Sequence, residues 1–217
     1  MNEDVETTRQ IAELAADPRP LLALDVDEVV LEFVTPFTAF VHSRGFAFKG
    51  DAFRLTGNVV HADTGQVADP AQTMGLLDGF FEEQADWQIC APGAQEVLTR
   101  MAADAEIVLL TAMPHRFRAQ RRALLDRLGL PYPLLTTEAS KGPSIRRLRG
   151  QSGRRAAFVD DLPHNLVSVR SASPDVSLFH LMAHQAMRAM LPPLPEGIHE
   201  LADWAEAETA ISTALHL

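Results

Sequence analysis

The sequence predicts an α/β fold in which a parallel sheet is covered by helices on both faces. Two observations support this class. Short apolar runs alternate along the chain with amphipathic helical patterns, and five of the runs have the length and composition of buried strands. One interval of about sixty residues does not fit this alternation, since it is far longer than a usual connection between elements. We therefore expect a three-layer, Rossmann-like core with a small, mainly helical insertion.

The expected strands cover residues 21–26, 106–111, 133–137, 155–160 and 176–182. Amphipathic patterns predict helices over residues 7–16, 93–103, 116–128, 163–171 and 200–215. Gly129 is placed as a helix stop, and Pro163 suits the first position of a helix. The core domain is thus expected to comprise residues 1–32 and 91–217.

The insertion, residues 33–90, follows directly after the first strand. Thr35-Pro36 and Asp69-Pro70 each resemble a helix cap followed by a first-turn proline, and Gly57-Asn58 indicates a turn or small hairpin between the two helices. Aromatic side chains are concentrated here, and we expect them to form the core of the insertion rather than a ligand site. They are Phe33, Phe37, Phe40, Phe46, Phe48, Phe53, Phe80, Phe81 and Trp87.

Composition excludes several classes of function. The 217 residues carry a net charge of −10, which argues against a broad basic surface for nucleic acid. No stretch approaches the roughly 20 apolar residues that a membrane span needs, and no secretory signal precedes residue 17. Cys90 is the only cysteine, as expected for a protein of a reducing compartment such as the cytoplasm.

Two carboxylates at the end of the first strand are the first candidates for chemistry. Asp25 and Asp27 follow the apolar run of residues 21–24, and in an extended chain they point to the same face. Buried together, they repel each other unless a cation or a shared proton intervenes. This arrangement suits a site that handles a metal ion and a phosphoryl group.

Further polar residues follow the other predicted strands. Thr111 ends the second strand, Lys141 lies just beyond the third at the start of a helix, and Asp160-Asp161 ends the fourth. Ligands of parallel α/β sheets bind at the carboxyl ends of the strands, so we expect these groups to meet at one edge. Each has an ordinary alternative: the aspartates can cap the next helix, the threonine can be structural, and the lysine can be solvated.

Other patterns give no comparable signal. The basic stretch of residues 146–155 is interpreted as an exposed helix face and loop, and no glycine-rich phosphate loop is present. The histidines at positions 42, 61, 115 and 164 show no metal-ligand spacing.

In order and spacing, Asp25-Val26-Asp27-Glu28, Thr111, Lys141 and Asp160-Asp161 resemble the four motifs of the haloacid dehalogenase-like hydrolase superfamily. The insertion is similar to the helical cap that many members carry at this point. One departure is Glu28-Val29, where a Gly-Thr pair is commoner, although glutamate also resembles some phosphatase branches.

The resemblance implies a role for each residue. Asp25 is the nucleophile that forms an aspartyl-phosphate, and Asp27 is the general acid and base. Thr111 and Lys141 hold the phosphoryl group. Mg²⁺ is bound by Asp25, the main-chain carbonyl of Asp27 and Asp160, with Asp161 behind them, although the sequence does not separate the two adjacent aspartates.

Asp27 favours phosphoryl transfer over cleavage of a carbon–halogen bond, because a halide leaving group needs no proton. We therefore expect a magnesium-dependent phosphatase. A phosphotransferase or phosphomutase and a non-catalytic binding protein are the alternatives. The small cap favours a small phosphorylated metabolite, such as a nucleoside monophosphate or sugar phosphate, over a phosphoprotein. Arg44, Lys49, Arg54 and His61 are candidate contacts in the insertion, each with solvated surface as its alternative. The sequence leaves the oligomeric state open.

Overall fold

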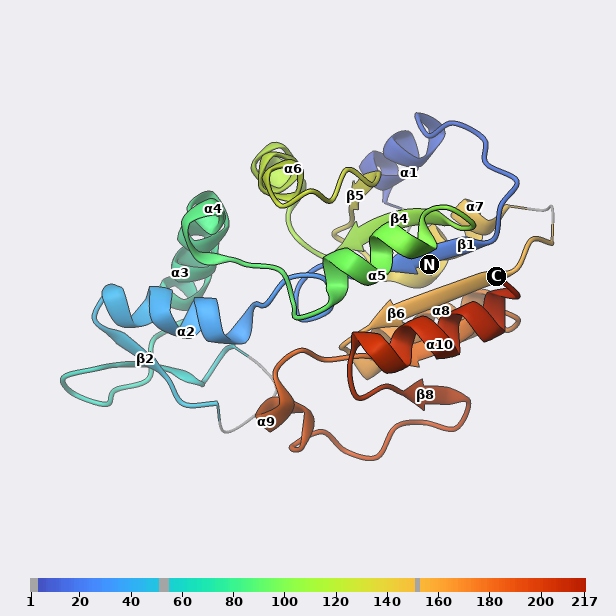
Figure 1. The fold of residues 1–217 in the computed structure, drawn as a ribbon. Helices are drawn as coiled ribbons and strands as arrows, with labels where there is room; N and C mark the ends of the chain where they lie inside the picture. Colours follow the sequence, from blue (N-terminus) through green and yellow to red (C-terminus); the bar gives the residue numbers. More distant parts are fainter. Residues whose placement is uncertain (1–3, 51–54, 151–152) are drawn as a thin grey trace.

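The core of the molecule is a parallel sheet. The structure, a computed structural model, describes residues 4–50, 55–150 and 153–217. Within them, six strands form this sheet in the order β5-β4-β1-β6-β7-β8 (Figure 1). The strands are β1 (Leu21–Leu24), β4 (Glu106–Thr111), β5 (Leu134–Thr136), β6 (Ala156–Asp160), β7 (Ser177–His180) and β8 (Ile198–Glu200).

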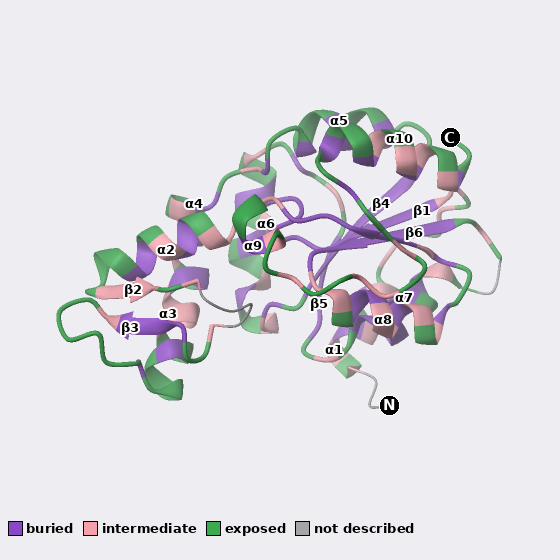
Figure 2. Ribbon diagram, turned by 90° about the horizontal axis from the view of Figure 1, so that it is seen from below, coloured by how far each residue is buried: buried purple, intermediate pink, exposed green. Residues whose placement is uncertain are grey.

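Helices cover both faces of the sheet, which confirms the predicted three-layer class (Figure 2). Helices α5 (Ala94–Met101), α6 (Arg118–Arg127) and α10 (Trp204–Leu215) pack on one face, and α1 (Val5–Ala12), α7 (Lys141–Arg149) and α8 (Pro163–Ala172) on the other. Side chains of β1 alternate between the two layers: Leu22 and Leu24 join the first, and Leu21 and Ala23 the second. Both faces of the strand are therefore buried, which explains its continuous apolar run.

The five predicted strands are all present, with ends shifted by up to two residues. The sixth, β8, was not predicted, because Ile198-His199-Glu200 at the sheet edge has no apolar run to mark it. Gly129 has a φ of 71° and ends α6 as expected, and Pro163 opens α8.

The insertion contains α2 (Val34–Ser43), the antiparallel pair β2 (Phe46–Phe48) and β3 (Val59–His61), α3 (Pro70–Glu82) and α4 (Gln84–Trp87). Its aromatic side chains pack together as predicted, with Phe37 and Phe80 fully buried and 5.4 Å apart between ring centroids. Met113 and Phe117 of the core domain join this cluster. Phe53 and Arg54 lie outside the described residues. The domain boundaries at residues 32/33 and 90/91 stay a prediction.

The two predicted helix caps of the insertion differ in outcome. Asp69 caps α3 through a reciprocal capping box with Gln72, as the Asp-Pro pair indicates. The predicted cap at Thr35 is wrong, since α2 already begins at Val34. Its first amide groups are capped instead by Glu28, a residue six positions earlier.

Two short helices complete the chain: the 3₁₀ turn η1 (His115–Phe117) and α9 (Gln185–Arg188). None of the helices in the described ranges is long and apolar enough to cross a membrane.

Candidate active site at the carboxyl edge of the sheet

The turn after β1 is built around Glu28. Its backbone has a φ of 62°, in the left-handed region that favours glycine. Its buried carboxylate offsets this strain by accepting three backbone hydrogen bonds, from Phe33 N (2.8 Å), Val34 N (2.6 Å) and His184 N (2.8 Å). Glu28 thereby ties the nucleophile loop to the start of the insertion and to the segment after β7, which explains how glutamate replaces the commoner glycine.

Lys141 joins two of the predicted acids. It is the first residue of α7 and is fully buried, and its Nζ lies 2.7 Å from Asp25 Oδ1 and 2.7 Å from Asp160 Oδ2. Burial opposes the charged ammonium, but the carboxylates of Asp160 and Asp25 outweigh it and raise the pKa of Lys141. Lys141 therefore stays a cation beneath the nucleophile position.

The carboxylate of Asp160 is held from several sides. Besides the lysine, it accepts hydrogen bonds from Leu162 N (2.8 Å) and Asn165 Nδ2 (3.0 Å) at the start of α8. Neither contact caps α8, because its N-cap is Leu162 and none of the described side chains caps it, so the helix-cap alternative for these aspartates is wrong. The adjacent Asp161 accepts no side-chain hydrogen bond from any residue the structure describes, and it lines the cavity above the sheet.

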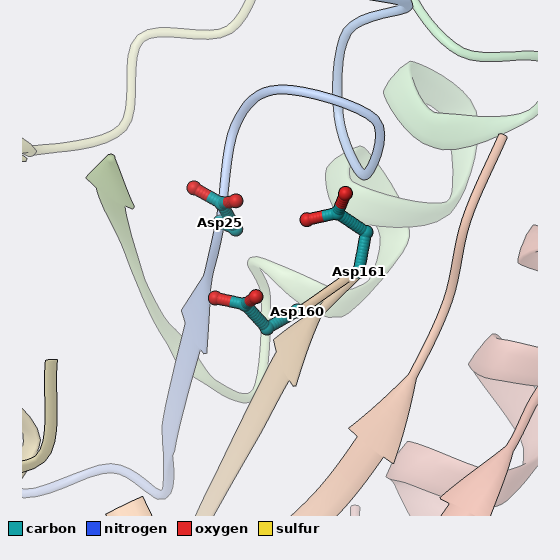
Figure 3. A group of neighbouring side chains, drawn as sticks. All are labelled: Asp25, Asp160 and Asp161. Carbon is teal, nitrogen blue, oxygen red and sulfur yellow. The ribbon is translucent and has the colours of Figure 1, made fainter. Parts of the chain in front are cut away.

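Three carboxylates converge at this edge: one oxygen each of Asp25, Asp160 and Asp161 lies within 4.8 Å of the others (Figure 3). Burial, followed by the repulsion of Asp160 and Asp27, raises the pKa of Asp25 to about 7, even though Lys141 opposes this. Burial and the charges of Asp160 and Asp25 likewise raise the pKa of Asp161 well above its usual range. A single lysine cannot balance three ionised carboxylates, so these residues suit a divalent cation with oxygen ligands.

Asp27 is bound by Arg121, a residue that the sequence did not single out. Its carboxylate accepts hydrogen bonds from Arg121 Nη1 (3.1 Å) and Nη2 (3.0 Å) and from Gln88 Nε2 (2.8 Å). Arg121 is fully buried in α6, and it also donates to Gln84 and Gln88 of the insertion. Its signal in the sequence is a charge on the apolar face of the helix, four residues after Phe117 and three before Leu124.

Thr111, the last residue of β4, is buried and lies beside Asp27, with 3.4 Å from its Oγ1 to Asp27 Oδ2. All six predicted site residues thus meet at one edge of the sheet, although their catalytic and metal-binding roles stay predictions. The other candidates lie elsewhere. Arg44 pairs with Glu83, Lys49 is exposed, and His61 packs against Phe46.

A cavity of about 400 Å³ lies between this edge and the insertion. Asp25, Asp27, Thr111 and Asp161 line one end of it. Most of the remaining wall is apolar and comes from both the insertion and the core. The volume is that of a small-molecule site.

Comparison with known proteins supports the fold. No family model and no curated protein matches the sequence, but many solved structures share the architecture. A HAD family hydrolase from Deinococcus radiodurans with bound phosphate and sodium has a TM-score of 0.59, with 15% identity over 91% of this chain and 96% of that one. A protein from Bacillus subtilis described as a HAD-hydrolase bound to magnesium has a TM-score of 0.63, with 12% identity over 93% of this chain and 100% of that one.

A predicted phosphoglycolate phosphatase from Haemophilus somnus has a TM-score of 0.57, with 12% identity over 91% of this chain and 100% of that one. These similarities span nearly the whole of both chains. The predicted haloacid dehalogenase-like fold is therefore confirmed, while identities of 12–15% show the fold alone and not the reaction or the substrate.

Proposed function

We propose that this chain, with its haloacid dehalogenase-like fold, is a magnesium-dependent phosphatase that hydrolyses small phosphate monoesters through an aspartyl-phosphate on Asp25. One observation carries the proposal: a buried carboxylate cluster with a single buried lysine opens into a small-molecule cavity at the carboxyl edge of a parallel sheet. The phosphate- and magnesium-bound structures of similar fold support it.

Four residues of this chain carry out the two proposed displacement steps. The Asp25 carboxylate attacks phosphorus, and the bond to the alcohol oxygen breaks as Asp27 donates a proton to that oxygen. A water then attacks the phosphorus of the aspartyl-phosphate and Asp27 takes a proton from it, while the bond from phosphorus to the Asp25 oxygen breaks. Inorganic phosphate leaves, and the Asp25 carboxylate is restored. Thr111 donates a hydrogen bond to the transferring group, and Lys141 offsets its negative charge.

Asp25 and the main-chain carbonyl of Asp27 would hold Mg²⁺ together with one of the adjacent aspartates. Asp160 is already bound by Lys141 and Asn165, whereas the side chain of Asp161 has no such partner among the described residues. This difference favours Asp161 as the direct ligand and Asp160 as its support. When bound, the cation neutralises the clustered carboxylates and the phosphoryl oxygens.

The test is phosphate release from p-nitrophenyl phosphate with and without Mg²⁺, in wild type and in Asp25→Asn. We expect magnesium-dependent turnover in the wild type and none in the folded variant. Folded Asp25→Asn protein that still turns over would refute the nucleophile assignment. Release with water as the sole acceptor distinguishes hydrolysis from transfer to a second substrate.

A second comparison isolates Asp27. Asp27→Ala is expected to lower turnover of an alkyl phosphate by about 10²–10⁴-fold. Turnover of p-nitrophenyl phosphate should fall much less, because p-nitrophenolate leaves without a proton. Equal losses on both substrates would show that Asp27 is not the general acid.

The single cysteine is consistent with our further proposal that the enzyme acts in the cytoplasm.

A further inference from the structure

The cavity at the active site has one polar end and an otherwise apolar wall. The insertion contributes Phe33, Phe48, Leu55, Met74, Leu77 and Phe81 to that wall. The core domain adds Met113 of the β4–η1 loop, Leu162 after β6 and Met187 of α9. The part of the substrate that extends away from the phosphoryl group is therefore surrounded by aromatic and aliphatic side chains.

No arginine, lysine or histidine in the described part of the chain lines this cavity. The remaining acid in the wall, Glu28, is not available to a ligand, because both of its carboxylate oxygens already accept backbone hydrogen bonds. The carboxylate of Asp27 is held by Arg121 and Gln88, and in the proposed mechanism it serves the leaving oxygen rather than the rest of the substrate. A substrate hydroxyl or carboxylate in this region would lose its water and find few groups to replace it.

An apolar leaving group binds this wall more tightly than a polar one of similar size. Each hydroxyl left unpaired in such a wall costs about five- to 150-fold in affinity, whereas an alkyl or aryl group is favoured by its own dehydration. The three methionines of the wall add unbranched, adaptable side chains, which suits alcohols of somewhat different shape.

We propose that the substrate is a phosphate monoester of a predominantly apolar alcohol or phenol, an inference that rests on the proposed phosphatase function. It replaces the expectation of a sugar phosphate or nucleotide, whose several hydroxyls need polar partners. It also separates this chain from a phosphoglycolate phosphatase, whose substrate carboxylate requires a cation beside it.

The test compares pentyl phosphate with glycerol 3-phosphate. Both are esters of primary alcohols with five non-hydrogen atoms beyond the ester oxygen, so they are similar in size, and in glycerol 3-phosphate two hydroxyls take the place of two carbons. We expect kcat/KM to be at least about tenfold higher for pentyl phosphate. Equal values, or a preference for glycerol 3-phosphate, would overturn the proposal while leaving the phosphatase function intact.

A matched pair of variants locates the preference in the cavity. Met74 and Met190 are 51% and 48% exposed, but Met74 lines the cavity and Met190 does not. Met74→Gln should reduce the preference for pentyl phosphate about fivefold, and Met190→Gln should change it less than twofold. Equal effects of the two variants would refute the assignment of this wall.

Binding provides a readout that does not depend on turnover. Calorimetry with Mg²⁺ should show pentylphosphonate binding at least about tenfold more tightly than 2,3-dihydroxypropylphosphonate. This result without turnover of any ester would support the apolar site and refute the phosphatase function. Equal binding of the two phosphonates would overturn the apolar site.

Discussion

Asp25→Asn tests whether repulsion among the clustered carboxylates destabilises the metal-free folded protein, and whether a bound cation removes that destabilisation. Asparagine has nearly the shape of a protonated aspartic acid, so the variant removes the charge and leaves the packing in place. In the wild type without metal, burial and the neighbouring carboxylates raise the pKa of Asp25 from 3.8 to about 7. The folded protein therefore resists ionisation of a group that ionises readily in the unfolded chain.

The sign of the effect follows from proton linkage. Between pH 4 and pH 7 the folded state holds the Asp25 proton and the unfolded state does not, so the contribution of Asp25 to wild-type stability falls as pH rises through this range. At about 1.4 kcal/mol per pKa unit, the difference amounts to roughly 4 kcal/mol at pH 8. Metal-free Asp25→Asn should therefore be more stable than wild type at pH 8, by up to about 4 kcal/mol, and nearly equal to it at pH 4.

Urea denaturation at pH 4–8 in EDTA measures this difference, with Asp63→Asn as the control for the same substitution at an exposed aspartate. Adding Mg²⁺ at 100 times its Kd should stabilise the wild type by about 2.7 kcal/mol. The variant, with one carboxylate fewer, should gain much less. An Asp25→Asn protein no more stable than wild type at pH 8 would refute the repulsion argument.

Three further substitutions test other parts of the site. Glu28→Ala removes three hydrogen bonds and should lower the free energy of unfolding in urea by about 2–4 kcal/mol. Glu28→Gly should lower it by about 1 kcal/mol less than Glu28→Ala does, because glycine accepts the φ of 62°. Equal losses in the two variants would argue against backbone strain. Arg121→Lys keeps a cation but loses the two-point contact with Asp27, so kcat for an alkyl phosphate should fall about 10–100-fold while KM stays within threefold. An unchanged kcat would show that Arg121 does not position Asp27. Gly142→Ala should destabilise the protein by about 1–3 kcal/mol in thermal unfolding, since the new Cβ would lie 2.3 Å from the Ser168 carbonyl oxygen; a stabilised variant would show that α7 and α8 can separate.

Much of the fold follows from local patterns in the sequence. A strand buried on both faces has to be continuously apolar, and β1, β4 and β6 therefore stand out from the helices around them. The edge strand β8 has no such requirement, and it was missed. Capping of α3 by Asp69 likewise depends only on neighbouring residues in the sequence. Capping of α2 by Glu28 instead depends on a backbone turn that the sequence does not indicate.

The sequence by itself determined the six polar residues of the site, because their positions at strand ends follow from the order of elements and from the rule that parallel strands end at one edge. Only the tertiary structure brought Arg121 and Gln88 to Asp27, separated the surroundings of Asp160 from those of Asp161, and placed an apolar wall opposite the carboxylates. Each of these depends on contacts between segments distant in the chain, and a hydrophobic residue has the same pattern whether it faces a core or a cavity.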